Sequence, residues 1–85
     1  QLAPGHAGDV TMVLCTLQPG CSSSGKMVSH LYTEVCFVIA GRIRALRAGG
    51  EELLGPGDTI RVTPGVLHDF YNAGDAPAVV LAVTF

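Results

Sequence analysis

The sequence has 85 residues, of which 48% are hydrophobic and 14% charged, and its formal net charge is -2. A chain of this length has room for one domain, so we expect a single domain over residues 1–85 that begins with an irregular arm over residues 1–8. The small negative charge excludes a general attraction to nucleic acid or to an anionic membrane. No apolar segment is long enough to cross a bilayer, and no signal peptide pattern is visible.

The three cysteines, Cys15, Cys21 and Cys36, are odd in number and form no C-x-x-C pair. This pattern argues against a disulfide framework and against a zinc knuckle. We therefore expect free thiols in a reducing, cytoplasmic setting, with Cys15 and Cys36 buried as small hydrophobic side chains.

Short runs of β-branched and aromatic residues, separated by glycine and proline turns, predict a chain made of strands. The expected strands and extended segments cover residues 10–17, 26–32, 35–40, 42–47, 51–54, 59–63, 66–70 and 78–85. The run 35–40 is expected to be buried, and the serine-rich residues 21–25 to be flexible. No helical segment competes, so the sequence predicts an all-β sandwich or small barrel.

Residues 42–47 carry three arginines, which we expect on one basic, solvated face of a strand. The glycine pair at residues 49–50 predicts a hairpin turn after this strand. Arginines opposite Glu51 and Glu52 would then form cross-strand ion pairs.

His30 and Glu34 are good metal ligands, but their spacing poses a geometric problem. On one straight strand the two residues would lie about 13 Å apart, at ~3.3 Å per residue. One ion needs both ligand atoms within roughly 2.0–2.2 Å. The sequence therefore predicts a corner near residues 31–33, unless the two side chains do not share an ion.

Two groups of residues then follow at regular spacing. The first is His30, three residues, Glu34, six residues and Gly41. The second is Gly57, five residues, Thr63-Pro64-Gly65, two residues, His68, three residues and Asn72. In this order and at this spacing the residues resemble the two motifs of the cupin superfamily, over the chain from about Pro19 to the end. The resemblance implies an all-β antiparallel barrel of the cupin type, or jelly roll.

The sequence departs from the cupin motifs at two positions. Val28 stands where the family has its first metal-binding histidine, and Thr63 stands where the second motif has a proline. The resemblance therefore implies a site of two histidines and one glutamate, made of His30, Glu34 and His68. Such a set with open positions suits one divalent transition metal, namely Fe(II), Mn(II), Ni(II) or Zn(II).

Other side chains are weaker candidates for the barrel interior. Tyr32 shares a face with His30 and is a candidate acid or hydrogen-bond donor. Val28, Cys36 and Phe70 are candidates for substrate contacts. Met12 and Met27 are candidates, with Phe70, for an apolar wall. For each of these side chains, ordinary core packing is the favoured role.

The resemblance favours a small metal-dependent enzyme acting on a small organic metabolite, as an oxygenase, an isomerase, or a cyclase or lyase. One alternative is a metal-free ligand-binding or sensor module, in which His30 pairs with Glu34 and His68 packs neutral against Phe70. Another is a structural cupin whose outer strands serve dimerisation. We expect a homodimer in any case, because an exposed apolar strand edge needs cover.

Overall fold

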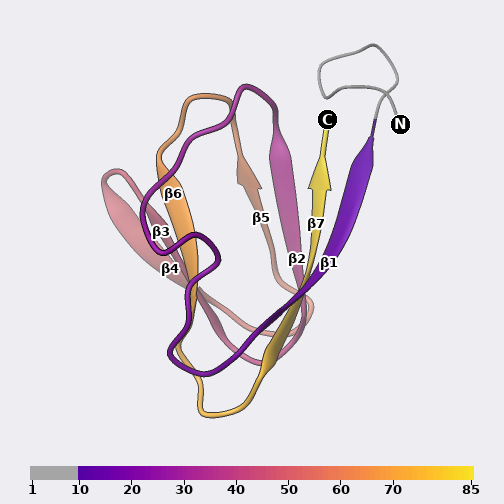
Figure 1. The fold of residues 1–85 in the computed structure, drawn as a ribbon, viewed down its shortest axis with the longest axis vertical. Coiled ribbons are helices and arrows are strands. Elements are labelled where there is room, and N and C mark those ends of the chain that lie inside the picture. Colours follow the sequence, from indigo (N-terminus) through magenta and orange to yellow (C-terminus); the bar gives the residue numbers. More distant parts are fainter. Residues whose placement is uncertain (1–9) are drawn as a thin grey trace.

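The structure is a computed structural model that describes residues 10–85 as two antiparallel β-sheets enclosing one core (Figure 1). The expected arm over residues 1–8 lies outside the described residues. The strands are β1 (Thr11–Leu17), β2 (Glu34–Ala40), β3 (Ile43–Arg47), β4 (Gly50–Leu54), β5 (Thr59–Val62), β6 (His68–Asn72) and β7 (Ala78–Thr84). The expected all-β jelly roll is confirmed, and residues 10–85 contain no helix that could span a membrane.

The strand order explains how distant motifs meet. One sheet has the order β1-β7-β2-β5, and the other has the order β4-β3-β6. The segment between β1 and β2 then runs beside β6 as an irregular outer edge, with bridges between Ser22 and Tyr71 and between Val28 and His68. Both sequence motifs therefore reach the same end of the molecule (Figure 1).

Alternate residues of the strands point into the core, as period-two patterning requires. The core includes Cys36 and Val38 from β2 and Ile43 from β3. The expectation that the whole run 35–40 is buried is wrong, because Phe37 is 39% and Ile39 45% exposed. Both side chains lie on the outer face of the four-stranded sheet, which no other described element covers.

The serine-rich residues 21–25 are fastened rather than free, contrary to the sequence expectation. Ser23 N donates to Phe70 O at 2.8 Å, and Asn72 N donates to Cys21 O at 2.9 Å. Asp69, 5% exposed, accepts hydrogen bonds from the Ser23 hydroxyl at 2.9 Å and from Ser24 N at 3.2 Å. A buried carboxylate must be hydrogen-bonded, so Asp69 holds this segment against β6.

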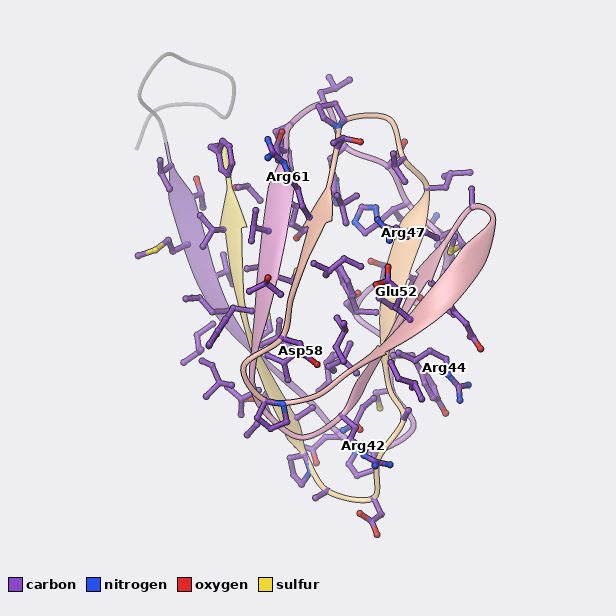
Figure 2. All side chains as sticks on the ribbon, turned by 180° about the vertical axis from the view of Figure 1, so that it is seen from behind. Arg42, Arg44, Arg47, Glu52, Asp58 and Arg61 are labelled. Carbon is purple, nitrogen blue, oxygen red and sulfur yellow. The ribbon has the colours of Figure 1, made fainter. Side chains whose placement is uncertain are left out.

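The arginines of β3 form the expected cross-strand pairs but do not share one face. Arg44 pairs with Glu51 at 3.6 Å on the outside, and Arg47 pairs with Glu52 (Figure 2). Arg47 has the parity of the buried residues of β3, and it also donates to Arg61 O on β5 at 3.5 Å. Because residues 44 and 47 are three apart, period-two geometry puts them on opposite faces.

Gly41, the last residue of the first motif, directly follows β2 and lies against Ala78 of β7, the neighbouring strand of the same sheet. Its φ is +86°, and a Cβ atom built there would lie 2.7 Å from Ala78 Cα. Gly49, in the hairpin turn, has a φ of +92° but no atom within 4 Å of such a Cβ. Gly41 is thus required by conformation and by space, and Gly49 by conformation alone.

We expect Gly41→Ala to lower the free energy of unfolding by about 3 kcal/mol or more, since left-handed strain of about 1–2 kcal/mol adds to a backbone clash. Gly49→Ala is the matched control. Its free energy of unfolding should fall only by the contribution of the left-handed strain, about 1–2 kcal/mol. Urea unfolding of both variants measures the difference. Equal losses would show that the close approach at Ala78 has no energetic weight.

The three cysteines are free, as expected, but their exposure differs. Cys36 is 3% exposed, Cys15 is half-buried and Cys21 is exposed. Burial, together with the nearby Glu34 carboxylate and then Cys15, raises the pKa of the Cys36 thiol from 9.0 to about 12. Cys36 is therefore protonated at neutral pH in this environment.

We expect iodoacetamide at pH 8 to modify Cys21 quickly and to leave Cys36 unmodified until the protein unfolds, because only a thiolate reacts and its formation at Cys36 is suppressed. Peptide mass spectrometry of the native and the urea-unfolded protein measures both sites. Rapid native labelling of Cys36 would contradict the assigned burial.

Candidate metal centre

Three side chains from distant parts of the sequence meet at one end of the barrel. His30 lies in the connection before β2, Glu34 is the first residue of β2, and His68 is the first residue of β6. Their ligand atoms all lie within 4.8 Å of one another. The chain bends at Leu31 and Tyr32, so the predicted corner is present, and it folds His30 back toward Glu34.

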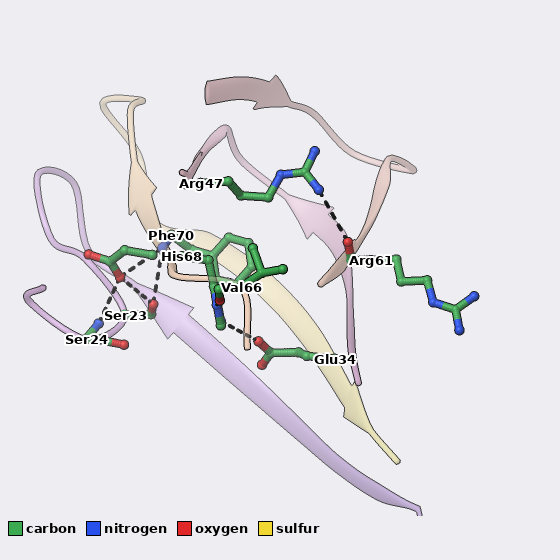
Figure 3. A network of polar contacts seen from close by, with 9 residues as sticks. Ser23, Ser24, Glu34, Arg47, Arg61, Val66, His68 and Phe70 are labelled. Carbon is green, nitrogen blue, oxygen red and sulfur yellow. Dashed lines mark hydrogen bonds and ion pairs between the residues drawn. The ribbon is translucent and has the colours of Figure 1, made fainter. Parts of the chain in front are cut away.

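His68 is the most firmly held of the three. Its main chain exchanges two hydrogen bonds with Val28, at 2.9 and 2.8 Å. Its side chain, 3% exposed, lies between Val66 O, 2.9 Å from Nδ1, and Glu34 Oε1, 3.0 Å from Nε2. Figure 3 shows the contact with Glu34, which joins β6 in one sheet to β2 in the other.

The proton positions on His68 follow from its partners. A carbonyl oxygen can only accept, so Nδ1 carries a hydrogen and donates it to Val66 O. In the neutral ring Nε2 is then a bare lone pair, and it faces a carboxylate oxygen that also accepts. Two acceptors 3.0 Å apart are unfavourable unless a proton lies between them, on Nε2 or on the carboxyl group, or a metal ion is bound by both groups.

The geometry fits a divalent ion. Two ligands at right angles, each about 2.1 Å from one ion, lie about 3.0 Å apart, which is the separation of Glu34 Oε1 and His68 Nε2. Ligand atoms as much as 4.8 Å apart would have to approach by ~0.6 Å to bind that ion from opposite sides and by ~1.8 Å to bind it at right angles. Metal-bound histidines usually donate their other N–H to a carbonyl or carboxylate, as His68 does here.

His30 is oriented by stacking and not by a pair with Glu34. Its ring lies 4.8 Å from the Tyr32 ring at an interplanar angle of 6° and 5.0 Å from the His68 ring. His30 O also accepts a hydrogen bond from Gly65 N at 2.9 Å. The alternative pairing of His30 with Glu34 is thus replaced by a pair of His68 with Glu34, because His68 projects from the facing sheet directly toward β2.

A cavity of about 130 Å³ adjoins these three side chains. Its lining is mostly apolar and consists of Cys15, Leu17, Ser23, Ser24, His30, Glu34, Cys36, His68, Phe70, Val80 and Ala82. Such a lining, with a few convergent polar groups, is typical of a small-molecule site.

The other candidates from the sequence divide into two groups. Cys36 and Phe70 line the cavity, and Phe70 also contacts the His68 ring at 5.6 Å. Val28 and Tyr32 are not among the lining residues, since Val28 pairs with the His68 main chain and Tyr32 stacks on His30. The expected wall of Met12, Met27 and Phe70 is wrong for both methionines.

Met12 is 67% and Met27 37% exposed. The parity of β1 sends Cys15 and Leu17 inward and Met12 outward, which the nearly continuous apolar run of that strand concealed. Sequence reasoning also missed Ser23 and Ser24 in the lining. Their partners are Asp69 and Phe70, which lie 45 to 47 residues farther along the chain.

Comparison with known proteins shows which family this chain is similar to. The family model of the Cupin domain matches residues 13–84. No curated protein matches the sequence. Among solved structures, a sugar phosphate isomerase of the cupin superfamily from Silicibacter pomeroyi is 30% identical with a TM-score of 0.81, over 94% of this chain and 52% of that one.

Two further structures are similar. A Cupin 2 conserved barrel domain protein from Salinispora arenicola is 25% identical with a TM-score of 0.82, over 100% of this chain and 70% of that one. A protein described as a predicted oxalate decarboxylase, from Thermotoga maritima, is 23% identical with a TM-score of 0.80, over 87% and 64% of the two chains, and this likeness shows the fold alone. The chain spans about half the length of the Silicibacter isomerase. Because the family model covers nearly all of the described residues, the chain belongs to the cupin superfamily.

Proposed function

We propose that this chain is a metal-dependent cupin enzyme that converts a small organic metabolite in the barrel interior, with one divalent ion held by His30, Glu34 and His68. The observation that supports this most is the pair of acceptors, Glu34 Oε1 and His68 Nε2, facing each other at 3.0 Å. The Nδ1–H of His68 is already given to Val66 O, so the pair needs either a shared proton or a metal ion between Nε2 and Oε1.

Each residue has a distinct task in this proposal. Glu34 supplies the negative charge that offsets part of the charge of the ion. His68 supplies a neutral nitrogen that Val66 O and the Val28 pairing keep in place. His30 supplies a second nitrogen, and Tyr32 positions its ring by stacking. A divalent ion in such a set would act as a Lewis acid and leave positions open to a chelating substrate.

The apolar lining of the cavity contributes by excluding water. Phe70, Val80 and Ala82 offer no hydrogen bonds from their side chains, so charge at the polar end is weakly screened. This environment suits either an enolisation, as in isomerases and lyases, or oxygen-dependent chemistry on a chelating substrate. The Silicibacter relative is named as an isomerase, which is compatible with the first of these.

The alternative is a metal-free binding or sensor module. A proton on His68 Nε2 would satisfy Glu34 equally well as an imidazolium–carboxylate pair. This alternative predicts a site that binds a small ligand without metal and without turnover. The two readings differ in what stabilises the fold, which can be measured directly.

We expect Fe(II), Mn(II), Ni(II) or Zn(II), at about a hundred times its dissociation constant, to raise the melting temperature by roughly 10 °C or more. Binding at that concentration adds about 2.7 kcal/mol, and 1 kcal/mol shifts a domain of this size by about 4–8 °C. Elemental analysis of protein purified without chelator should show about one ion per chain. Glu34→Gln and His68→Gln should abolish both effects.

Glu51→Gln is the matched control, because Glu51 pairs with Arg44 on the outside and should not alter the metal response. Val28→His, which adds a third imidazole opposite His68, should strengthen metal retention. An unchanged affinity in a folded Val28→His protein would mean that the first motif is aligned wrongly. Protein without metal and without any metal-dependent stabilisation would refute the metal site, and stabilisation by a metabolite alone would favour the sensor module.

We also propose that the chain pairs with a second copy of itself through the outer face of the sheet β1-β7-β2-β5. Its cross-strand rows are apolar and include Met12–Val83–Val35 and Leu14–Leu81–Phe37. Arg61, at the edge of the sheet, is the single charged side chain on this face of the described strands. A self-complementary contact across four strands would bury roughly 1,000 Å² in total, near the lower limit for a specific interface.

We expect wild-type protein to sediment as a dimer and Leu14→Lys to sediment as a monomer, since the lysine would bring two charges into the apolar contact. Leu53→Lys, on the other sheet, is the control, because Leu14 and Leu53 are 65% and 67% exposed. Analytical ultracentrifugation measures all three proteins. A monomeric wild type, or dissociation by both variants alike, would contradict the assigned face.

A further inference from the structure

We infer that the substrate of this site is a small chelating acid with a hydroxyl group at its far end, and not a phosphorylated sugar. This inference rests on the proposed metal site. It adds the size and the charge of the substrate, and it names one residue that determines specificity. It is carried by the volume of the cavity, by the absence of cationic side chains from its lining, and by the hydrogen bonds of Ser23.

The cavity is too small for a sugar phosphate. Its volume of about 130 Å³ is close to that of an engineered cavity of about 150 Å³ that holds benzene. The enclosed part of a ligand therefore has about six to eight non-hydrogen atoms. A hexose phosphate has about twice that number, so most of it would lie outside.

The charges around the cavity also argue against a phosphate. All five lysines and arginines of the sequence lie in the described part of the chain, and none lines the cavity. Arg44 and Arg47 are paired with Glu51 and Glu52 (Figure 2). Phosphate groups are usually bound by arginine, lysine or a helix N-terminus, and residues 10–85 contain no helix.

The proposed ion determines the charge at the near end. A divalent cation and the Glu34 carboxylate together leave one positive charge, which one carboxylate of a substrate would neutralise. A neighbouring oxygen, as in a 2-hydroxy or 2-oxo acid, would let that substrate occupy two open positions. The site is thus suited to a monoanionic chelator at its metal end.

Ser23 lines the same cavity as the three candidate ligands, and we assign it the recognition of the hydroxyl group of the substrate. Its hydroxyl donates its single hydrogen to Asp69 Oδ1 at 2.9 Å and accepts from Phe70 N at 3.3 Å (Figure 3). The same Asp69 oxygen accepts from Ser24 N at 3.2 Å, which fixes the segment. Any contact between the Ser23 hydroxyl and a ligand must therefore use the oxygen as an acceptor, so that ligand must carry an O–H or N–H group.

The test uses Mn(II)-loaded protein and three acids that share one chelating head. Lactate ends in a methyl group, glycerate in a hydroxyl group, and terminally phosphorylated glycerate in a phosphate. Titration calorimetry gives the dissociation constant of each. We expect glycerate to bind about threefold to tenfold more tightly than lactate, the effect of one hydrogen bond, and the phosphorylated acid to bind most weakly.

Two variants separate hydroxyl recognition from chelation. Ser23→Ala should bring glycerate to the level of lactate while binding of Mn(II) and lactate is unchanged. Ser29→Ala, at an exposed serine outside the lining, is its control. Ala82→Leu fills the cavity and should weaken all three acids about tenfold with Mn(II) still bound, which keeps the test decisive if Ser23→Ala does not fold.

The outcomes distinguish an error in the inferred substrate from an error in the proposed metal site. If Mn(II) binds but the phosphorylated acid binds as tightly as glycerate, or if Ala82→Leu binds the acids like wild type, the inference on the substrate is wrong. If Mn(II) itself does not bind, the proposed metal site is wrong instead.

Discussion

The hydrogen bonds of His68 join the parts on which the site depends. Its main chain is paired with Val28 on one side and with Arg47 of β3 on the other, so the residue cannot shift along its sheet. Its ring then reaches from Val66 O to Glu34 in the opposite sheet. One side chain thus sets both the spacing of the two sheets at this end and the direction of a bare nitrogen lone pair.

The two ends of the barrel differ: one is closely packed and stabilises the fold, and the other contains the candidate site. At one end Val38, Ile43 and Ala78 are fully buried, and Ala78 of β7 lies so close to Gly41 that only glycine fits at position 41. Asn72, 1% exposed, fastens this end by donating to Leu17 O at 2.8 Å and to Ala76 O at 2.9 Å. At the other end the packing gives way to a cavity. A domain of this size has little stability to spare, so the close packing at the first end is what allows a cavity at the second.

The sequence predicted the fold and the meeting of His30, Glu34 and His68 because those features leave local signals. Glycine and proline turns mark the strand ends, and spaced histidine and glutamate residues mark the motifs. The corner between His30 and Glu34 could be predicted because the reach of a strand forbids any straight alternative.

What the sequence did not reveal depends on long-range contacts. The order of Ser23 comes from Asp69, and nothing in a run of serines indicates that partner. The outward direction of Met12 depends on which face of β1 meets the other sheet, and an almost uninterrupted apolar run carries no such information. The partner of Glu34 was likewise decided by the position of β6 and not by sequence distance.

The corner that carries His30 is attached to the sheets only around its margins. Leu31 is 97% exposed, while His30 O is bonded to Gly65 N and Thr33 pairs with Phe85. Of the three candidate ligands, His30 is therefore the one that lies beside an exposed corner, whereas Glu34 and His68 begin strands. In the proposed metal site, exchange of the ion would then need only a local opening of this corner, which costs less free energy than global unfolding.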